Sequence, residues 1–351
     1  MDRKTCLCYN IGMKMTLMGT GTSHGIPVVA CSCPVCTSEN PHDKRYRCSA
    51  YIVNDDPPED GKPASTTNIV IDTGPEFRIQ ALENKIKRLD GVLLTHSHAD
   101  HCHGLDDLRI FSFKKPPEMY RGAECPNSYL SRNDAIALAA SENSVRETPG
   151  LGLPIYAPSS TIESLVFRFA YIFNTVASGG GIPKLHLVPA DGNNDENPVR
   201  IGSVEAVPVP MIHGPMIDSG WVVRPEKKPA GEKFHSIAYL TDCNFISDES
   251  IEIVRKSSGI SSGAGVLDHL VIDALRKRPH PTHNNFDKAL EYADRIGAEH
   301  TWLTHICHDN SHVQIQQYID ENLHKYKNLL EIVKNGGSVS PAYDGLVLET
   351  F

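Results

Sequence analysis

The chain has 351 residues, of which 40% are hydrophobic and 22% are charged. This composition provides enough apolar material for a sizeable core and excludes a wholly disordered or fibrous chain. The net charge is −9, and nowhere do five or six basic residues run together. Because non-specific affinity for nucleic acid comes mainly from Lys and Arg, the charge disfavours a nucleic-acid polymer as partner.

Apolar stretches are too short for a membrane span. The stretch 164–173 is one of the longest and is interrupted by Arg168, whereas a spanning helix needs about 20 apolar residues. Lys4 is not followed by the apolar run and small-residue cleavage site of a secretory leader. We therefore expect a cytoplasmic protein that makes no membrane contact.

The predicted elements alternate between strands and helices along the chain. Short runs rich in Val, Ile, Leu and Thr predict strands at 15–18, 49–53, 68–71, 91–94, 204–209, 236–240, 269–272, 300–303 and 345–348. Apolar spacings of three and four predict helices at 76–88, 162–173, 286–296 and 313–333. The order predicts a mixed α/β (α+β) fold without strict repetition of one unit.

We expect one domain with decorations. The predicted division is an N-terminal tail at 1–13 and a single domain at 14–351. Stretches that contain many Pro, Gly, Asp and Asn residues, or that lack a clear period, predict insertions or long loops near 55–67, 114–153, 189–200 and 224–232.

The strongest chemical signal follows the predicted strand 91–94. His96, His98, Asp100 and His101 are four potential ligands within six residues. Imidazole nitrogens and a carboxylate at the end of a buried strand are what a site for two metal ions needs. The alternative, a solvated histidine-rich loop, does not explain the apolar strand that leads into the run.

This His-x-His-x-Asp-His string resembles the signature of the metallo-β-lactamase superfamily. The resemblance implies a four-layer αβ/βα sandwich with metals at one edge, and further ligands at later strand ends. His213, Asp242 and His305 occur in the expected order. Each of these three residues would be weak evidence alone, because a polar residue at a strand end is often a cap.

The resemblance also assigns roles to these residues. One ion would be held by His96, His98 and His213, the other by Asp100, His101 and His305, and Asp242 would bridge the two. Asp72 would accept an N–H from a ligand imidazole and fix its orientation; the alternative is an Asp that initiates a turn. Zinc, manganese or iron suits such ligands.

A second metal site is predicted at the crowded cysteines. Ten cysteines are too few for a disulfide scaffold, and Cys31, Cys33 and Cys36 are spaced to face one zinc ion. His308 is the preferred fourth ligand of this structural zinc. The residues themselves leave Cys307, His24 and His42 as competitors.

The cysteine cluster indicates one branch of the superfamily. Together with the segments 18–27, 47–50 and 71–78 and the His305-x-x-His308 pair, it resembles the branch that contains the cyclic-phosphate phosphodiesterase of the carbon–phosphorus lyase pathway. That similarity spans about residues 14–309 and implies a structural zinc on the three cysteines and His308. It also implies that His283 faces the scissile phosphate as a proton donor or charge stabiliser; the alternative is a surface histidine beside a helix.

The sequence thus predicts a hydrolase, most specifically a phosphodiesterase. A metal-bridging hydroxide would cleave a small cyclic phosphate or nucleotide-like diester, with Asp100, Asp242 and His283 as catalytic residues. The expected cofactors are two divalent ions and one structural zinc, and the expected partners are a small phosphorylated substrate and, by resemblance, a second copy of the chain.

Three alternatives stay open at this point. The same metals would serve an RNA 3′-processing endonuclease or a thioester or lactone hydrolase. A metal-folded scaffold that binds a phosphorylated ligand without turnover is a non-enzyme alternative.

Overall fold

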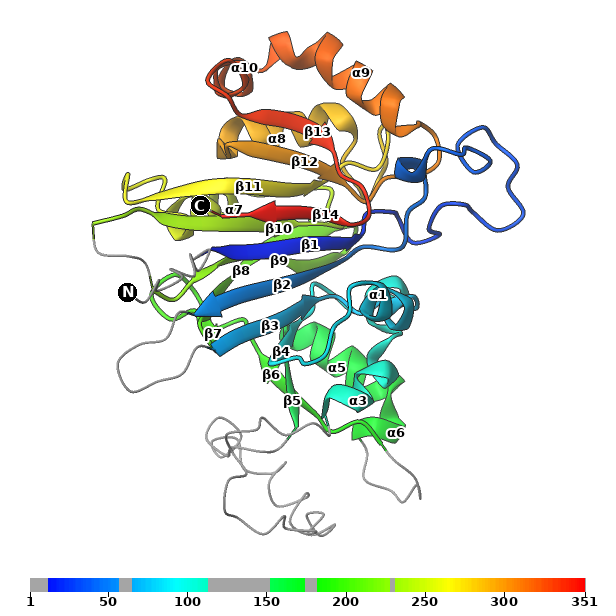
Figure 1. Cartoon of the computed structure of the whole chain (residues 1–351), viewed down its shortest axis with the longest axis vertical. Helices are drawn as coiled ribbons and strands as arrows, with labels where there is room; N and C mark the ends of the chain where they lie inside the picture. Colours follow the sequence, from blue (N-terminus) through cyan, green and yellow to red (C-terminus); the bar gives the residue numbers. More distant parts are fainter. Residues whose placement is uncertain (1–11, 57–64, 113–151, 174–181, 228–230, 351) are drawn as a thin grey trace, which may run out of the picture.

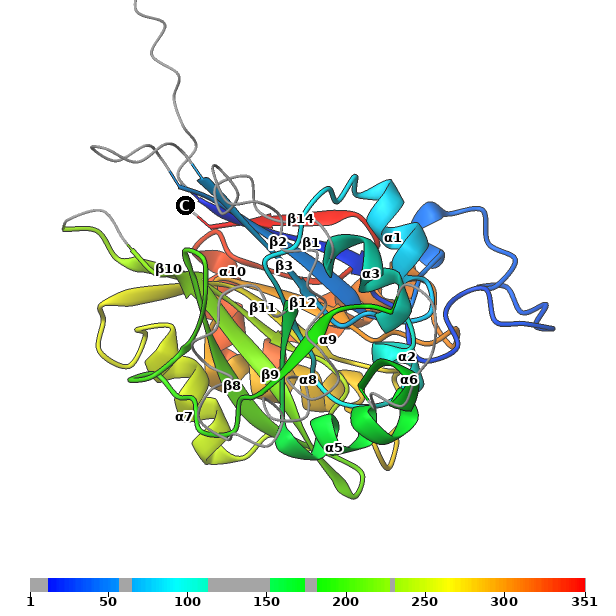
Figure 2. The same cartoon turned by 90° about the horizontal axis from the view of Figure 1, so that it is seen from below.

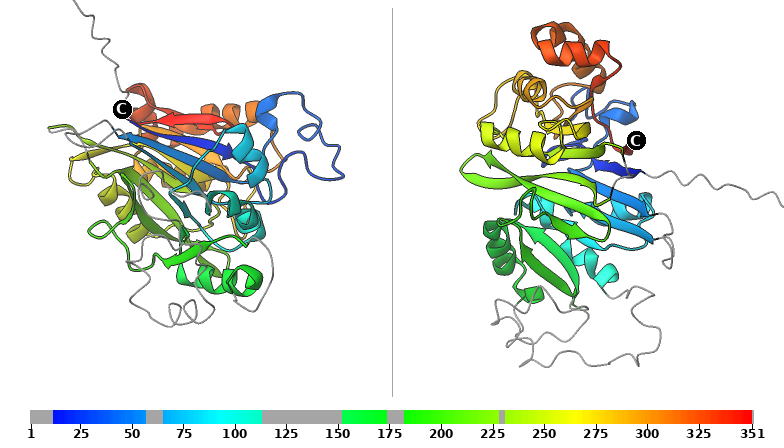
Figure 3. Two further views of the ribbon diagram at one scale, coloured as in Figure 1. Left: turned by 60° about the horizontal axis from the view of Figure 1, so that its bottom comes forward. Right: turned by 90° about the vertical axis from the view of Figure 1, so that its left-hand side faces the viewer.

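The computed structural model describes residues 12–56, 65–112, 152–173, 182–227 and 231–350. In these residues two seven-stranded sheets face each other, and helices cover the outer face of each sheet. Figures 1 and 3 show α8, α9 and α10 on one side of the sheets and α1, α3 and α5 on the other. This is the four-layer αβ/βα sandwich that the sequence predicts.

The first sheet has the order β14-β1-β2-β3-β4-β5-β6. Strands β3 to β6 are parallel to one another, and β2 is antiparallel to both β1 and β3. The strands are β1 (Met13–Gly19), β2 (Ser49–Asp56), β3 (Ser65–Ile71), β4 (Gly91–Leu93), β5 (Leu153–Ala157), β6 (Leu185–Pro189) and β14 (Leu346–Glu349).

The second sheet has the order β13-β12-β11-β10-β9-β8-β7. Strands β10 to β13 are parallel, whereas β8 and β9 form an antiparallel hairpin. The strands are β7 (Val199–Ile201), β8 (Val204–His213), β9 (Met216–Pro225), β10 (Phe234–Leu240), β11 (Gly265–Asp273), β12 (His300–Thr304) and β13 (Ser338–Pro341).

The helices connect these strands. They are α1 (Phe77–Glu83), α2 (Ala99–Cys102), α3 (Arg109–Ser112), α5 (Ser159–Arg168), α6 (Ala170–Phe173), α7 (Asp248–Ser257), α8 (Phe286–Ile296), α9 (His312–Asn322) and α10 (Lys327–Lys334), with short 3₁₀ turns at Pro41–Asp43, Leu105–Leu108 and Leu323–Lys325. No helix in the described ranges is long and apolar enough to cross a membrane.

Three apolar layers hold the sandwich together. Met15, Ile52 and Ile69 of the first sheet pack against Trp221 and Tyr239 of the second, and all five side chains are fully buried. A second layer lies between the second sheet and α7 to α9, and a third lies between the first sheet and α1, α2 and α5. Burial on this scale is the main stabilising contribution of the fold.

The nine predicted strands all correspond to strands of the structure, and the helix predicted at 286–296 has the observed bounds of α8. The prediction of one helix over 313–333 is wrong, because a 3₁₀ turn at Leu323–Lys325 separates α9 from α10. Sequence reasoning missed β5, β6, β7, β9, β13 and α7. Most of these strands are short or contain Pro, Gly or Asp, which weakens the apolar pattern.

Some predicted boundaries also differ from the structure. Met13 is fully buried at the start of β1, although the sequence places it in a tail. Of the predicted loops, 55–67 includes the end of β2 and the start of β3, and 224–232 includes the end of β9. The insertion predicted at 114–153 lies almost wholly outside the described residues.

Candidate metal centre

The predicted ligands lie at the carboxyl ends of strands from both sheets. Asp72 follows β3, the 96–101 string follows β4, His213 ends β8, Asp242 follows β10 and His305 follows β12. Since parallel strands of a sheet end at the same edge, these distant segments meet in space. Asp72, Asp242 and His305 all have positive φ, at 59°, 62° and 58°. A non-glycine residue in this region is strained, and such strain is typical of functional sites.

Asp242 lies at the centre of two ligand clusters. One cluster contains His96, His98, His213 and Asp242; the other contains Asp100, His101, Asp242 and His305; within each, the ligand atoms all lie within 4.8 Å of one another. The structure thus brings together every residue that the sequence proposes as a ligand of the two ions, in the same two groups.

Distances from Asp242 define the geometry. Its Oδ2 lies 3.3 Å from His96 Nε2 and 2.7 Å from His101 Nε2. Its Oδ1 lies 3.7 Å from His213 Nε2 and 3.5 Å from His305 Nε2. The edges of a metal tetrahedron with bonds of about 2.1 Å are about 3.4 Å long, so these separations suit ligands that share an ion.

Buried ligand atoms without hydrogen-bond partners test whether metal ions fit here. His96 Nε2 and His305 Nε2 are buried, and neither has a hydrogen-bond partner. Buried polar atoms are normally paired, so this pattern needs an explanation. Divalent ions would supply the missing partners, and the donor set of imidazoles and carboxylates matches zinc, manganese or iron.

The pKa shifts of the ligand histidines are consistent with metal binding. Burial lowers the pKa of His96, His98 and His305, which keeps these imidazoles neutral, as a metal ligand must be. Burial also disfavours a charge on His101, but Asp100 and Asp72 outweigh it and raise the pKa of His101 well above 6.5. The carboxylates around His101 therefore favour a positive charge at this place, and a bound metal ion would provide it.

Asp72 orients His101 from behind. Its Oδ2 lies 2.7 Å from His101 Nδ1, and its Oδ1 accepts the Thr95 backbone N–H at 2.9 Å. Asp72 is fully buried. Gly74 lets the chain close over the site, because a Cβ at this glycine would lie 2.2 Å from the carbonyl oxygen of Asp100.

His283 enters the centre from the segment before α8. Its Nδ1 lies 3.1 Å from Asp242 Oδ1 and 3.1 Å from Asp273 Oδ2. Burial alone would lower the pKa of His283, but the carboxylates of Asp242 and Asp273 beside its Nδ1 raise it to about 10. Asp273 is fully buried at the end of β11, and its Oδ1 accepts the Asn284 N–H at 3.0 Å.

Neither Asp273 nor Thr95 was singled out in the sequence analysis. The Thr95 hydroxyl lies 2.9 Å from Asp72 Oδ2 and 3.0 Å from His96 Nδ1, and thus links a carboxylate to a ligand imidazole. A carboxylate at the end of a buried strand was the available signal for Asp273. Thr95 gave no comparable signal, because threonine is ordinary at the end of a strand.

The cysteine cluster forms a separate site beside the first. His308 Nδ1 lies 3.3, 3.5 and 3.4 Å from the sulfur atoms of Cys31, Cys33 and Cys36. Cys307, His24 and His42 are not in this cluster, so His308 is the fourth member. In Figures 1 and 2 the segment that carries the cysteines, drawn in blue, projects beyond the sheets. Four such side chains suit a closed structural zinc site.

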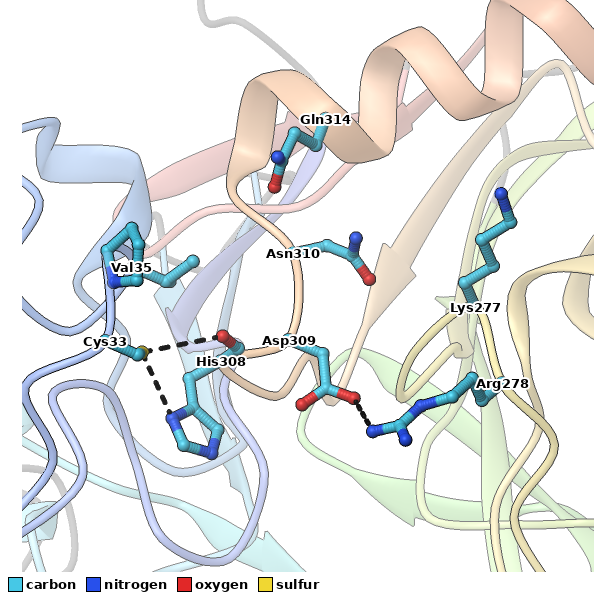
Figure 4. A pocket seen from close by; sticks show the side chains of 9 residues that line it. Cys33, Val35, Lys277, Arg278, His308, Asp309, Asn310 and Gln314 are labelled. Atoms are coloured by element: carbon cyan, nitrogen blue, oxygen red, sulfur yellow. Dashed lines mark hydrogen bonds and ion pairs between the residues drawn. The ribbon is translucent and has the colours of Figure 1, made fainter.

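A cavity of ≈ 550 Å³ adjoins the cysteine cluster, and Cys33, Lys277 and Arg278 are among its lining residues. Figure 4 shows Cys33 beside His308, with Arg278 paired to Asp309 on the other side. The Cys36 backbone N–H donates to Cys33 Sγ at 3.4 Å, which is the main reason why the pKa of Cys33 falls to about 6. A low pKa favours the thiolate, the form that binds metal.

Comparisons with known proteins agree with this architecture. The family model described as "Beta-lactamase superfamily domain" matches residues 67–148 and 134–306. A crystal structure described as a new diphosphatase from the PhnP family is 32% identical, with a TM-score of 0.64; the match covers 96% of this chain and 97% of that one. The metallo-β-lactamase fold protein YhfI of Bacillus subtilis, 17% identical with 96% and 99% coverage and a TM-score of 0.54, shares the fold.

A curated relative is longer than this chain. The octanoyltransferase of Porphyromonas gingivalis is 30% identical over 328 residues, which are 93% of this chain. The chain spans 52% of that relative's length. The family match covers well over half of the chain, and the fold agrees with it. The chain therefore belongs to the metallo-β-lactamase superfamily, and it is similar to a member of the PhnP branch.

Proposed function

We propose that this protein is a metal-dependent phosphodiesterase that cleaves a small cyclic phosphate or a nucleotide-like diester. Two features support the proposal: the two ligand clusters that share Asp242, and the 32% identity to a diphosphatase of the PhnP family. In the proposed site His96, His98 and His213 would hold one divalent ion, Asp100, His101 and His305 would hold the other, and Asp242 belongs to both ligand groups.

Two divalent ions at these ligands would activate water at neutral pH and neutralise charge on the phosphoryl oxygens. The chain's own residues supply the geometry. Asp72 fixes the ring of His101 through Nδ1, and the Thr282 carbonyl oxygen lies 2.8 Å from Nδ1 of His213. These partners direct the Nε2 atoms of both histidines toward the centre.

The placement of His283 is the observation that carries the assignment to phosphate ester cleavage. Contacts of Nδ1 with Asp242 and Asp273 hold the ring beside the ligand clusters and favour its protonated form. Nε2 is then the nitrogen that can reach a substrate. Cleavage of an alkyl phosphate ester expels a basic alkoxide, and a proton delivered to that oxygen speeds the step.

Hydrolysis of bis(4-nitrophenyl) phosphate by protein loaded with manganese or zinc tests the proposal. Asp242→Ala removes the carboxylate common to both clusters, and we expect it to abolish turnover. Asp106→Ala, which removes a half-exposed carboxylate on a 3₁₀ turn, is the matched control and should keep full activity. Metal content is measured in all three proteins. Wild-type protein with bound metal but no turnover above Asp242→Ala would contradict the proposal.

Thioester hydrolysis is a second candidate, because the Porphyromonas gingivalis relative is named an octanoyltransferase. The same metal centre could attack a carbonyl carbon. An octanoyl thioester assayed beside the phosphodiester distinguishes the two. Turnover of the thioester alone, sensitive to Asp242→Ala, would replace the phosphodiesterase assignment.

A further inference from the structure

A third group of ligand atoms lies against the two clusters already described. It contains Asp242, Asp273, His283 and His305, and its ligand atoms also lie within 4.8 Å of one another. Two of its members, Asp273 and His283, belong to neither of the first two clusters. They therefore remain available when both of those clusters are filled.

The separations in this group match those of the other clusters. His283 Nδ1 is 3.1 Å from Asp273 Oδ2 and 3.1 Å from Asp242 Oδ1, and His305 Nδ1 is 3.6 Å from Asp273 Oδ2. These values lie within the 2.7–3.7 Å range found around Asp242 in the first two clusters. They are close to the edge of about 3.4 Å expected for ligands that share one ion.

His305 provides an independent observation. Its side chain is 1% exposed, and its Nδ1, like its Nε2, is buried without a hydrogen-bond partner. Nδ1 therefore faces Asp273 without a hydrogen bond to it. Asp273 Oδ2 keeps its only ring hydrogen bond with His283, which leaves this carboxylate able to bind a cation.

The surrounding charge determines how strongly another cation would bind. Asp72, Asp100, Asp242 and Asp273 contribute four buried or nearly buried carboxylates around the centre. Four negative charges balance two divalent ions. A further ion would thus bring net positive charge, so it should bind more weakly than the first two.

We propose that Asp273 and His283, together with Asp242, form an additional, weaker divalent-cation site beside the two-ion centre. The mixed carboxylate and imidazole donors select zinc or a similar transition metal over magnesium or calcium, and water completes the coordination. An ion at Nδ1 replaces the proton that His283 shares with Asp273.

The consequence for activity follows from the proposed function. An ion at Nδ1 would leave His283 as a neutral imidazole, whose Nε2–H is a much weaker acid than that of the imidazolium and would not protonate the leaving group. Excess zinc should therefore inhibit the enzyme reversibly, although zinc at lower concentration activates it. This consequence rests on the proposed role of His283, whereas the site itself does not.

Metal binding tests the site without any assay of turnover. The holoenzyme is dialysed against a series of buffered free-zinc concentrations, and zinc per chain is measured by mass spectrometry. We expect a plateau with the first clusters and the cysteine site filled, then about one further zinc per chain at higher free zinc. Asp273→Asn and His283→Gln should keep the plateau and lose the additional ion.

The variants are chosen to keep the fold. Asparagine at 273 retains the oxygen that accepts the Asn284 N–H, and His283→Gln gives a second test if Asp273→Asn is unstable. His280→Gln is the matched control: its ring lies 5.0 Å from that of His283, but it is not in the group. This control should still bind the additional ion.

Two outcomes would overturn the site. One is a wild-type isotherm with no increase above the plateau, and the other is an increase that both variants retain. Failure of the phosphodiesterase proposal gives a different result, since the zinc isotherm would be as expected while bis(4-nitrophenyl) phosphate is not hydrolysed.

Discussion

His305 and His308 lie on the same short turn after β12, yet their imidazoles belong to different ligand clusters. His305 Nε2 lies 3.5 Å from Asp242 Oδ1, whereas His308 Nδ1 lies 3.3 Å from Cys31 Sγ. Backbone hydrogen bonds fix the turn between them, from Ile306 to Thr20 and from Cys307 to Leu275, both at 3.0 Å. A metal ion held by the cysteines and His308 would therefore hold the same turn that carries His305.

Loss of the cysteine site should weaken the neighbouring centre as well. We expect Cys31→Ser to remove one zinc per chain, lower the melting temperature and reduce metal affinity at the centre that contains His305. The physical reason is that His308 loses its anchor and the turn gains freedom. Metal analysis after dialysis and thermal denaturation measure both effects.

Cys307→Ser is the control for that experiment. Cys307 is buried on the same turn, but it is not part of the cysteine cluster. It should retain all bound zinc. If Cys31→Ser retained the full zinc content, the structural zinc site would be refuted.

Asp72→Asn should reduce metal affinity at the two-ion centre by about 10- to 100-fold. Asparagine cannot orient the His101 ring as the carboxylate does across 2.7 Å. Asparagine tolerates the positive φ of 59° at this position, so the backbone should keep its conformation. Competition with a chelator of known affinity provides the measurement, with Asp106→Asn as control. Equal affinity in Asp72→Asn and wild type would contradict the proposed orientation of His101.

His283→Gln should slow the cleavage of esters with poor leaving groups much more than that of esters with good ones. For an alkyl leaving group we expect kcat to fall about 10²- to 10⁴-fold, because the alkoxide needs a proton. For 4-nitrophenolate, a weak base, the change should be small. Rates of both substrate types are compared in metal-loaded protein. An equal loss with both would show that His283 acts on binding or folding and not as a proton donor.

His269 should make the protein less stable as the pH falls from 6.5 toward 4. Trp302 Nε1 donates to His269 Nδ1 at 3.2 Å, and His269 Nε2 lies 3.1 Å from the Glu349 carbonyl oxygen, an arrangement that suits the neutral ring. Burial is the main reason why the pKa of His269 falls from 6.5 to about 4. In this range the unfolded chain binds more protons than the folded one, so stability rises with pH.

The expected loss of stability for His269 is on the order of 2–3 kcal/mol between pH 6.5 and pH 4. Urea denaturation at several pH values measures it. His269→Gln, whose amide can satisfy both partners, should show a shallower pH dependence than wild type, while the exposed His324→Gln should match wild type. Identical pH profiles for His269→Gln and wild type would contradict the prediction.

The 96–101 string shows how much of the site the sequence could predict. Ligands that are close along the chain can be recognised from the sequence. Alternation along a strand and one turn already place His96, His98, Asp100 and His101 together. The apolar runs likewise predicted the nine strands, since burial on both faces demands Val, Ile and Leu. Short edge strands such as β13 (Ser338–Pro341) have no such apolar pattern.

Asp273 and Thr95 show what the sequence alone left undecided. A single carboxylate or hydroxyl at a strand end is ordinary, and its role depends on which atom faces it across the sandwich. Only the tertiary structure places Asp273 3.1 Å from His283 and Thr95 3.0 Å from His96. The sequence by itself determined the ligand types and the cysteine cluster, because those depend on local spacing, and its motifs resemble those of the metallo-β-lactamase superfamily. The tertiary structure decided which distant ligands meet at Asp242, and it selected His308 as the fourth member of the cysteine cluster. Such contacts between residues far apart in the chain form only when the two sheets pack face to face.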